Sequence, residues 1–111
     1  MEIRTSLAFI RAIHQIPRKQ KLVWALIPVI GTPNYTLGVF LCGTDKVLNI
    51  KTGMFEQIND SARPLPATRR SEGGWYVYTA GDVVHRLPKY YVSDMYYARV
   101  YNKNMIESYL L

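Results

Sequence analysis

Apolar side chains recur every three or four positions between residues 5 and 16, with polar side chains between them. This spacing places the apolar residues on one face of an α-helix. Thr5 or Ser6 can serve as the N-cap, and Pro17 ends the helix because the residue before a proline resists the helical conformation. The pattern therefore predicts an amphipathic helix at the start of the chain.

The next part of the chain alternates apolar runs with short clusters of turn residues. The runs rich in β-branched and aromatic residues cover 22–30, 35–42 and 47–51. Each run is typical of a β-strand, and the turn residues of 31–34 join the first two as a hairpin. Because Pro28 lacks a backbone donor, the first strand is expected to be bulged there. Residues 52–58 fit either the last strand of this meander or a short helical turn.

A long segment from residue 60 to residue 74 interrupts the regular pattern. It is rich in proline, glycine and arginine, and its few apolar residues follow no period. Segments of this composition form turns and loops, and loops of this length are often mobile or functional. We therefore expect an exposed, flexible loop over 60–74.

A second hairpin is predicted after this loop. Along residues 75–79 two tyrosines alternate with Trp75, Val77 and Thr79, and after turn residues 80–82 the segment 83–87 forms the returning strand. For 95–101 helix and strand compete, and the aromatic and β-branched content with a period of two favours a strand. The last residues, 105–111, predict a short C-terminal helix.

These elements predict an α+β fold in a single compact domain over residues 1–111. It comprises the N-terminal helix, an antiparallel sheet of about five or six strands built from two meanders, and the C-terminal helix. The hydrophobic fraction of 49% is typical of a chain that folds around a packed core. The single Cys42 lies in an apolar run, where a buried thiol is expected, and it excludes a disulfide within the chain.

The charge balance indicates anionic partners. Fourteen Lys and Arg residues stand against eight Asp and Glu residues, which gives a formal net charge of +6. Such a balance favours polyanions or acidic protein surfaces and does not choose between them. The first residues do not form a signal peptide, and the longest apolar stretch, 22–30, is far shorter than the ~20 residues that span a bilayer. The sequence therefore predicts an intracellular, cytoplasmic protein without membrane contact, encoded by a cell or by a virus within it.

Catalytic motifs are sparse. His14 and His85 could supply the acid and base of a metal-independent ribonuclease, but their spacing does not bring them together. The acidic residues are dispersed, and neither paired metal-ligand motifs nor a glycine-rich phosphate loop occurs. We predict a protein without a catalytic site, metal or cofactor, and a nuclease that uses His85 is the second alternative.

Aromatic and basic residues concentrate in 75–103. Alternation along the predicted strands is expected to turn Trp75, Val77, Val84 and Val100 inward. The same alternation turns Tyr76 and Tyr78 outward, where rings can stack on bases or contact a protein. The predicted partner-binding residues are Arg63, Arg69, Arg70, Tyr76, Tyr78, Arg86, Lys89, Tyr90, Tyr91 and Arg99.

The predicted function is non-enzymatic binding through this basic, tyrosine-rich surface. The expected partner is an acidic protein surface or a nucleoprotein complex, which the protein could block sterically. Direct binding of DNA or RNA is the first alternative, because rings and cations also suit nucleic acid. The small size and basic composition resemble accessory or anti-defence proteins of phages by analogy alone. Homo-oligomers are compatible with the sequence.

Overall fold

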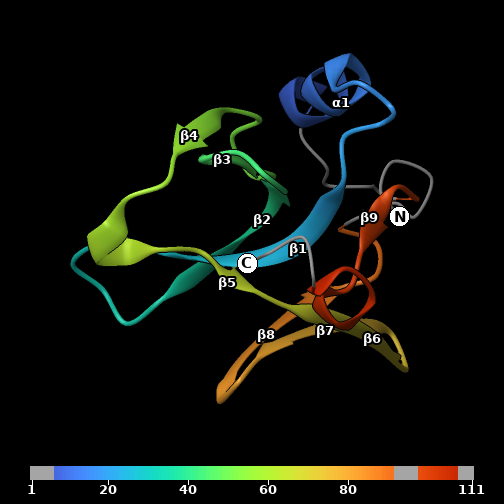
Figure 1. The fold of residues 1–111 in the computed structure, drawn as a ribbon. Helices are drawn as coiled ribbons and strands as arrows, with labels where there is room; N and C mark the ends of the chain where they lie inside the picture. Colours follow the sequence, from blue (N-terminus) through green and yellow to red (C-terminus); the bar gives the residue numbers. More distant parts are fainter. Residues whose placement is uncertain (1–6, 92–97, 108–111) are drawn as a thin grey trace.

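One helix, two β-sheets and two short 3₁₀ turns make up the computed structural model, which describes residues 7–91 and 98–107 (Figure 1). The helix is α1 (Leu7–Gln15), and the 3₁₀ turns are η1 (Asp60–Ala62) and η2 (Lys103–Met105). The strands are β1 (Leu22–Pro28), β2 (Tyr35–Leu41), β3 (Lys46–Asn49), β4 (Phe55–Gln57), β5 (Leu65–Pro66), β6 (Thr68–Glu72), β7 (Trp75–Ala80), β8 (Val83–Pro88) and β9 (Val100–Tyr101). The predicted α+β class is confirmed.

Helix α1 matches the predicted N-terminal helix and buries Phe9, Ala12 and Ile13. The proposed caps at positions 5 and 6 lie outside the described residues. Gly53 lies against the beginning of this helix with φ +72°, and a Cβ there would stand 2.4 Å from the Phe9 nitrogen. Only glycine fits this close approach without displacing the helix.

The larger sheet has six strands in the order β4-β3-β2-β1-β5, and β9 pairs with β1 as well. The β1–β2 hairpin is regular up to its last pair, Pro28 with Tyr35, so the expected bulge is absent. Strand β4 settles the alternative for residues 52–58 in favour of a strand. Strand β9 is parallel to β1, whereas we expected only antiparallel pairs.

Both faces of the six-stranded sheet are covered. Leu22, Trp24 and Leu26 of β1 face the main core, to which α1 and the three-stranded sheet also contribute. On the opposite face Val23 packs with the buried Cys42 and with residues near the C-terminal turn. As a result, six consecutive residues of β1 are buried.

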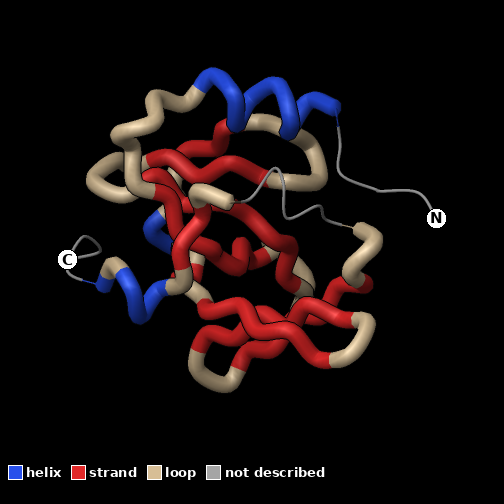
Figure 2. Tube along the Cα trace, turned by 90° about the vertical axis from the view of Figure 1, so that its right-hand side faces the viewer, coloured by secondary structure: helices blue, strands red, loops and turns tan. Residues whose placement is uncertain are grey.

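The smaller sheet has three strands in the order β6-β7-β8. Its last two strands are the predicted second hairpin, and they form a sheet of their own rather than joining the first meander. Figures 1 and 2 place this sheet and α1 at opposite ends of the molecule, with the larger sheet between them.

The expectation of a loop without secondary structure over 60–74 is wrong. That segment contains η1, β5 and β6. Strand β6 pairs with β7 from Thr68–Thr79 to Glu72–Trp75. Its polar sequence lacks an apolar period because β6 is an edge strand whose outward side chains meet no core. Strand β6 is held in place by backbone hydrogen bonds to β7 rather than by burial of apolar side chains.

The C-terminal part is described up to residue 107. Of the strand expected over 95–101, residues 100 and 101 form β9, and 95–97 lie outside the described residues. Of the helix expected over 105–111, Met105 ends the 3₁₀ turn η2 and Ile106 is buried beside Val23. No helix in the described part of the chain is long and apolar enough to cross a membrane.

Candidate functional site

The inner face of the three-stranded sheet is aromatic. Tyr78 is fully buried, and its ring meets the Trp24 ring edge-on at a centroid distance of 5.1 Å. Tyr76 is also buried, with 9% of its surface exposed. The expectation that these two tyrosines face outward is wrong. The other face of the sheet carries Arg70, Glu72 and Arg86, whose charges are costly to bury, so the sheet packs on the core with the face of the two tyrosines.

The outer face of the same sheet carries exposed apolar side chains. Trp75 is 39% exposed and Val84 is 57% exposed, so the expectation that both point inward is wrong. Val77 is buried as expected, although it shares this face. Its neighbours across the two ladders are Arg70 and Arg86, whose long aliphatic stems can shield it.

Two arginines give this face its positive charge. The Arg86 guanidinium lies over the Trp75 ring, 4.6 Å from its centroid. Arg70 forms an ion pair with Glu72, two residues along the same strand. We define the outer face as Arg70, Glu72, Trp75, Val77, Val84 and Arg86. Across the two ladders Arg70, Val77 and Arg86 form the middle row, Glu72 and Trp75 lie in the row on one side of it, and Val84 lies in the row on the other side.

Arg69 and Lys89 belong to the other side of the sheet. The Arg69 guanidinium lies 4.4 Å from the Tyr76 ring centroid and 5.2 Å from that of Trp24. The Lys89 ammonium lies 5.4 Å from the Tyr76 centroid. Both cations therefore cover inner-face aromatic rings. Of the two adjacent arginines, Arg69 therefore lies on the inner side of the sheet and Arg70 on the outer face.

Arg99 lies at the end of α1. Its guanidinium donates hydrogen bonds to the backbone carbonyls of Ile13, Ile16, Pro17 and Gln20, at 3.3, 2.9, 2.6 and 3.4 Å. A cation there also complements the negative end of the helix dipole. Burial and the nearby charge of Arg18 lower the pKa of Arg99. We predicted a binding role for Arg99 from the sequence, and in the structure its guanidinium caps the end of α1.

Arg63, Tyr90 and Tyr91 are spread over other places. Arg63 pairs with Asp60 at 3.0 Å and lines a cavity of about 220 Å³ with residues of the larger sheet. Tyr90 is 41% exposed, and Tyr91 is half-buried against the core. Of the ten residues proposed from the sequence, Arg70 and Arg86 share the outer face.

A groove runs along the inner side of β8. Its lining residues are Val29, Asn34, Tyr35, Thr36, Lys51, His85, Leu87 and Tyr91. Its volume is about 380 Å³. Burial lowers the pKa of His85. His14 lies on α1, at the end of the molecule opposite β8, so the fold does not bring the two histidines together (Figures 1 and 2).

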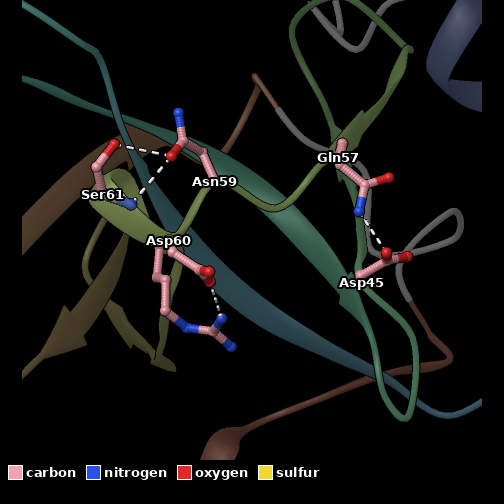
Figure 3. Close-up of polar contacts among 6 residues, drawn as sticks. Asp45, Gln57, Asn59, Asp60 and Ser61 are labelled. Carbon is pink, nitrogen blue, oxygen red and sulfur yellow. Dashed lines mark hydrogen bonds and ion pairs between the residues drawn. The ribbon is translucent and has the colours of Figure 1, made fainter.

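Short polar contacts hold the connection from β4 to η1 (Figure 3). The Asn59 side chain accepts hydrogen bonds from the backbone N–H and the hydroxyl of Ser61, at 2.9 and 2.7 Å. Gln57 donates to Asp45, and this hydrogen bond lowers the pKa of the Asp45 carboxyl. The Asn59 contacts cap η1, and the Gln57 contact joins β4 to the turn before β3. Within 7–91 and 98–107 no group of three or more His, Cys, Asp or Glu residues could hold a metal.

Comparisons with protein-family models, curated proteins and solved structures gave no match. Any functional argument therefore depends on the surface itself. The sequence prediction assigned the wrong face to Trp75, because alternation marks two faces of a strand without saying which one the core covers.

Proposed function

We propose that this protein is a non-enzymatic binding protein that docks through its outer face on an acidic surface of a partner protein. The observation that carries the proposal is the exposure of Trp75 beneath the Arg86 guanidinium, with Val84 exposed on the same face beyond Arg86. Tryptophan and arginine are the residues that most often dominate binding energy at protein interfaces.

The chemistry of the outer face favours a protein over nucleic acid. Single-strand binding surfaces usually offer several rings on which successive bases stack. Here two of the tyrosines expected to do so, Tyr76 and Tyr78, are in the core. The outer face keeps one ring, and Glu72 would repel a phosphate close to Arg70. A tryptophan and a valine among mainly positive side chains match the aromatic, arginine-rich composition of protein interfaces.

The formal charge of +6 supports the choice of an acidic partner. A basic surface accelerates encounters with acidic surfaces and suppresses docking on basic ones. Occupying the partner's surface could block it to other molecules, which is the inhibitory role that the sequence suggested. A partner already bound to nucleic acid fits the same charge argument.

Nucleic-acid binding remains a second candidate because of a different cluster. Arg18, Lys19 and Lys21 are exposed after α1, and no described residue forms an ion pair with any of them. The Lys21 ammonium lies 5.6 Å from the centroid of Tyr101. We call Arg18, Lys19 and Lys21 the connector cluster. It has cations without carboxylates, which suits a phosphate backbone.

Affinity capture from cells that contain the protein tests the proposal. The bait is compared with a Trp75→Ala/Arg86→Glu variant and with a Lys19→Glu/Lys21→Glu control, which changes at least as much charge on the connector cluster. We expect an acidic protein that the first variant loses and the control retains. The captured protein is then purified and its affinity for each bait is measured by calorimetry.

The same measurement separates the two candidates. For duplex nucleic acid, the logarithm of the affinity falls linearly with the logarithm of the salt concentration, with a slope of about −0.9 per phosphate neutralised. Such a dependence, together with loss of binding in the control variant, would identify duplex nucleic acid as the ligand. Equal binding by the wild type and the outer-face variant would contradict the proposed docking surface.

A further inference from the structure

The hydrogen bonds of Arg69 reveal which backbone groups of the three-stranded sheet point to its edges. The Arg69 N–H donates to the Asn102 side-chain oxygen at 2.7 Å, and the Asn102 amide donates to the Arg69 carbonyl at 3.3 Å. Both backbone groups of Arg69 therefore point away from β7. Since Arg69 pairs with Tyr78, this is a non-hydrogen-bonded pair of the β6–β7 ladder.

This assignment extends across β7 to β8. The backbone groups of Tyr78 point away from β6 and so toward its β8 partner, His85. Hydrogen-bonded and non-hydrogen-bonded pairs alternate in an antiparallel ladder. The residues on either side of His85 therefore direct their N–H and C=O groups outward. Val84 and Arg86 are these two residues.

Two further contacts agree with this alternation. The two-residue turn at Gly81 and Asp82 requires a hydrogen-bonded pair between Ala80 and Val83, two positions from the Tyr78–His85 pair. At the other end, the Lys89 N–H donates to the carbonyl of residue 74 at 2.9 Å. The backbone N–H and C=O groups of the even-numbered residues of β7 therefore point toward β8 along the whole strand.

The two edges of the sheet differ in how they are covered. On β6, the Asn102 side chain occupies both backbone groups of Arg69, and the Lys103 N–H donates to the Ala67 carbonyl at 3.0 Å. On β8, no hydrogen bond from a described residue reaches the outward backbone groups of Val84 or Arg86. Natural proteins usually protect an edge of this kind.

The surroundings of the β8 edge suit an extended peptide. A strand added there would direct alternate side chains to the two faces of the sheet. Those on one face would lie beside Val84 and Arg86. Those on the other would enter the groove lined by Leu87, Tyr35 and Lys51. Each face therefore offers an apolar side chain and a cation. These are Val84 and Arg86 on the outer face, and Leu87 and Lys51 in the groove.

We propose that the partner binds by strand addition, with an extended acidic segment pairing along the free edge of β8. This inference rests on the proposed function and names its binding mode. Main-chain hydrogen bonds to Val84 and Arg86 supply affinity, and alternate side chains supply specificity. A carboxylate of the segment lies opposite Arg86, because oppositely charged cross-strand pairs are stabilising. An apolar side chain of the segment fills the groove.

The probe for this proposal is a synthetic peptide. A display library of random peptides about nine residues long, enough to cover one strand with flanks, is selected on the wild-type protein. We expect the selected sequences to alternate apolar and acidic residues. The best binder is synthesised and its dissociation constant is measured by fluorescence anisotropy.

Val84→Pro is the decisive variant. It removes an N–H that points to the free edge, keeps an apolar side chain, and leaves the ladder to β7 intact. Ser71→Pro is the matched control, because the Ser71 N–H points to the free edge of β6 by the same alternation. We expect Val84→Pro to weaken the peptide at least about tenfold and Ser71→Pro to change its affinity less than about twofold.

Amide hydrogen exchange in the wild-type protein gives an answer that does not depend on a substitution. Peptide binding should slow exchange at Val84 and Arg86 and leave Ser71 unchanged. If Val84→Pro fails to fold, this measurement alone decides.

The outcomes separate the binding mode from the function. If Trp75→Ala loses the peptide while exchange at Val84 and Arg86 is unaffected, strand addition is overturned and the outer-face docking stands. If no peptide binds, or neither Trp75→Ala nor Val84→Pro weakens binding, strand addition is overturned, and the affinity capture with the outer-face variant decides the docking surface by itself. Formation of a stable dimer in which a second copy protects Val84 would also overturn the partner-strand proposal. In that dimer Arg86 could pair with Asp82 of the other copy.

Discussion

The two sheets of this protein each contain a meander of consecutive hairpins, yet they differ in how far their two faces are buried. In the six-stranded sheet, β1 is buried along six consecutive residues, because the core lies on one side and the C-terminal residues pack on the other. In the three-stranded sheet the inner face is buried, whereas the outer face buries Val77 and leaves Trp75 and Val84 exposed. The second sheet therefore keeps apolar side chains at the surface, and exposed apolar side chains among polar ones are typical of interaction sites.

The largest effect is expected from comparing the two tryptophans. Trp24→Ala removes a ring that is 1% exposed and should lower the free energy of unfolding by about 3–5 kcal/mol. Trp75→Ala removes a ring on the outer face and should cost about 1 kcal/mol, because part of it is already in water. Urea denaturation of both variants measures the two values. Similar losses would mean that the outer face contributes to the core.

The next effect concerns Arg99, which joins the helix end to the rest of the fold. Arg99→Met keeps most of the aliphatic stem but leaves the carbonyls at the end of α1 without their charged donor, and should cost about 1–3 kcal/mol. Arg18→Met, at an exposed neighbouring position, is the control. Thermal unfolding followed by circular dichroism provides the comparison, and a loss no greater than that of the control would contradict the capping role.

A smaller difference should separate Arg69 from Arg70. Arg69→Ala removes a cation that covers two inner-face rings and should lower stability by about 1–2 kcal/mol. Arg70→Ala removes an exposed ion pair and should change stability by less than about 0.5 kcal/mol. For partner affinity we expect the reverse order. If Arg70→Ala were the more destabilising, the assignment of the two faces would be wrong.

The smallest effect is a pH dependence from the inner side of β8. Because burial lowers the pKa of His85 in the folded protein, the unfolded chain binds its proton more readily. His85 therefore contributes to stability above the ordinary histidine pKa, and this contribution is lost as the pH falls from that value through the lowered pKa of the folded state. His85→Gln should reduce the decline in unfolding free energy between about pH 7.5 and pH 5.5. His14→Gln controls for the loss of a histidine, and an unchanged decline in His85→Gln would exclude His85 as its source.

Local patterns in the sequence predicted much of the fold. The helical spacing of apolar residues located α1, and β-branched runs between turn clusters located β1, β2, β7 and β8. Strand β6 was missed, because its sequence from Thr68 to Glu72 contains no apolar residue and its backbone pairing leaves no periodic signal. The candidate site was predicted in part. Arg70 and Arg86 were expected on a binding surface, and Trp75 was assigned to the core.

Composition was enough to establish the excess of positive charge, and local sequence patterns were enough to predict the class of the fold, the positions of its hairpins and the amphipathic helix. The elements could be predicted because they depend on neighbouring residues. Which face of β7 meets the core could not be predicted locally, since a period of two marks two faces without saying which one is covered. The same holds for the contact of Arg99 with a helix end more than eighty positions earlier in the chain, and for the edge of β8, whose outward backbone groups at Val84 and Arg86 receive no hydrogen bond from a described residue. Contacts between distant segments fix these features, and no local pattern contains them.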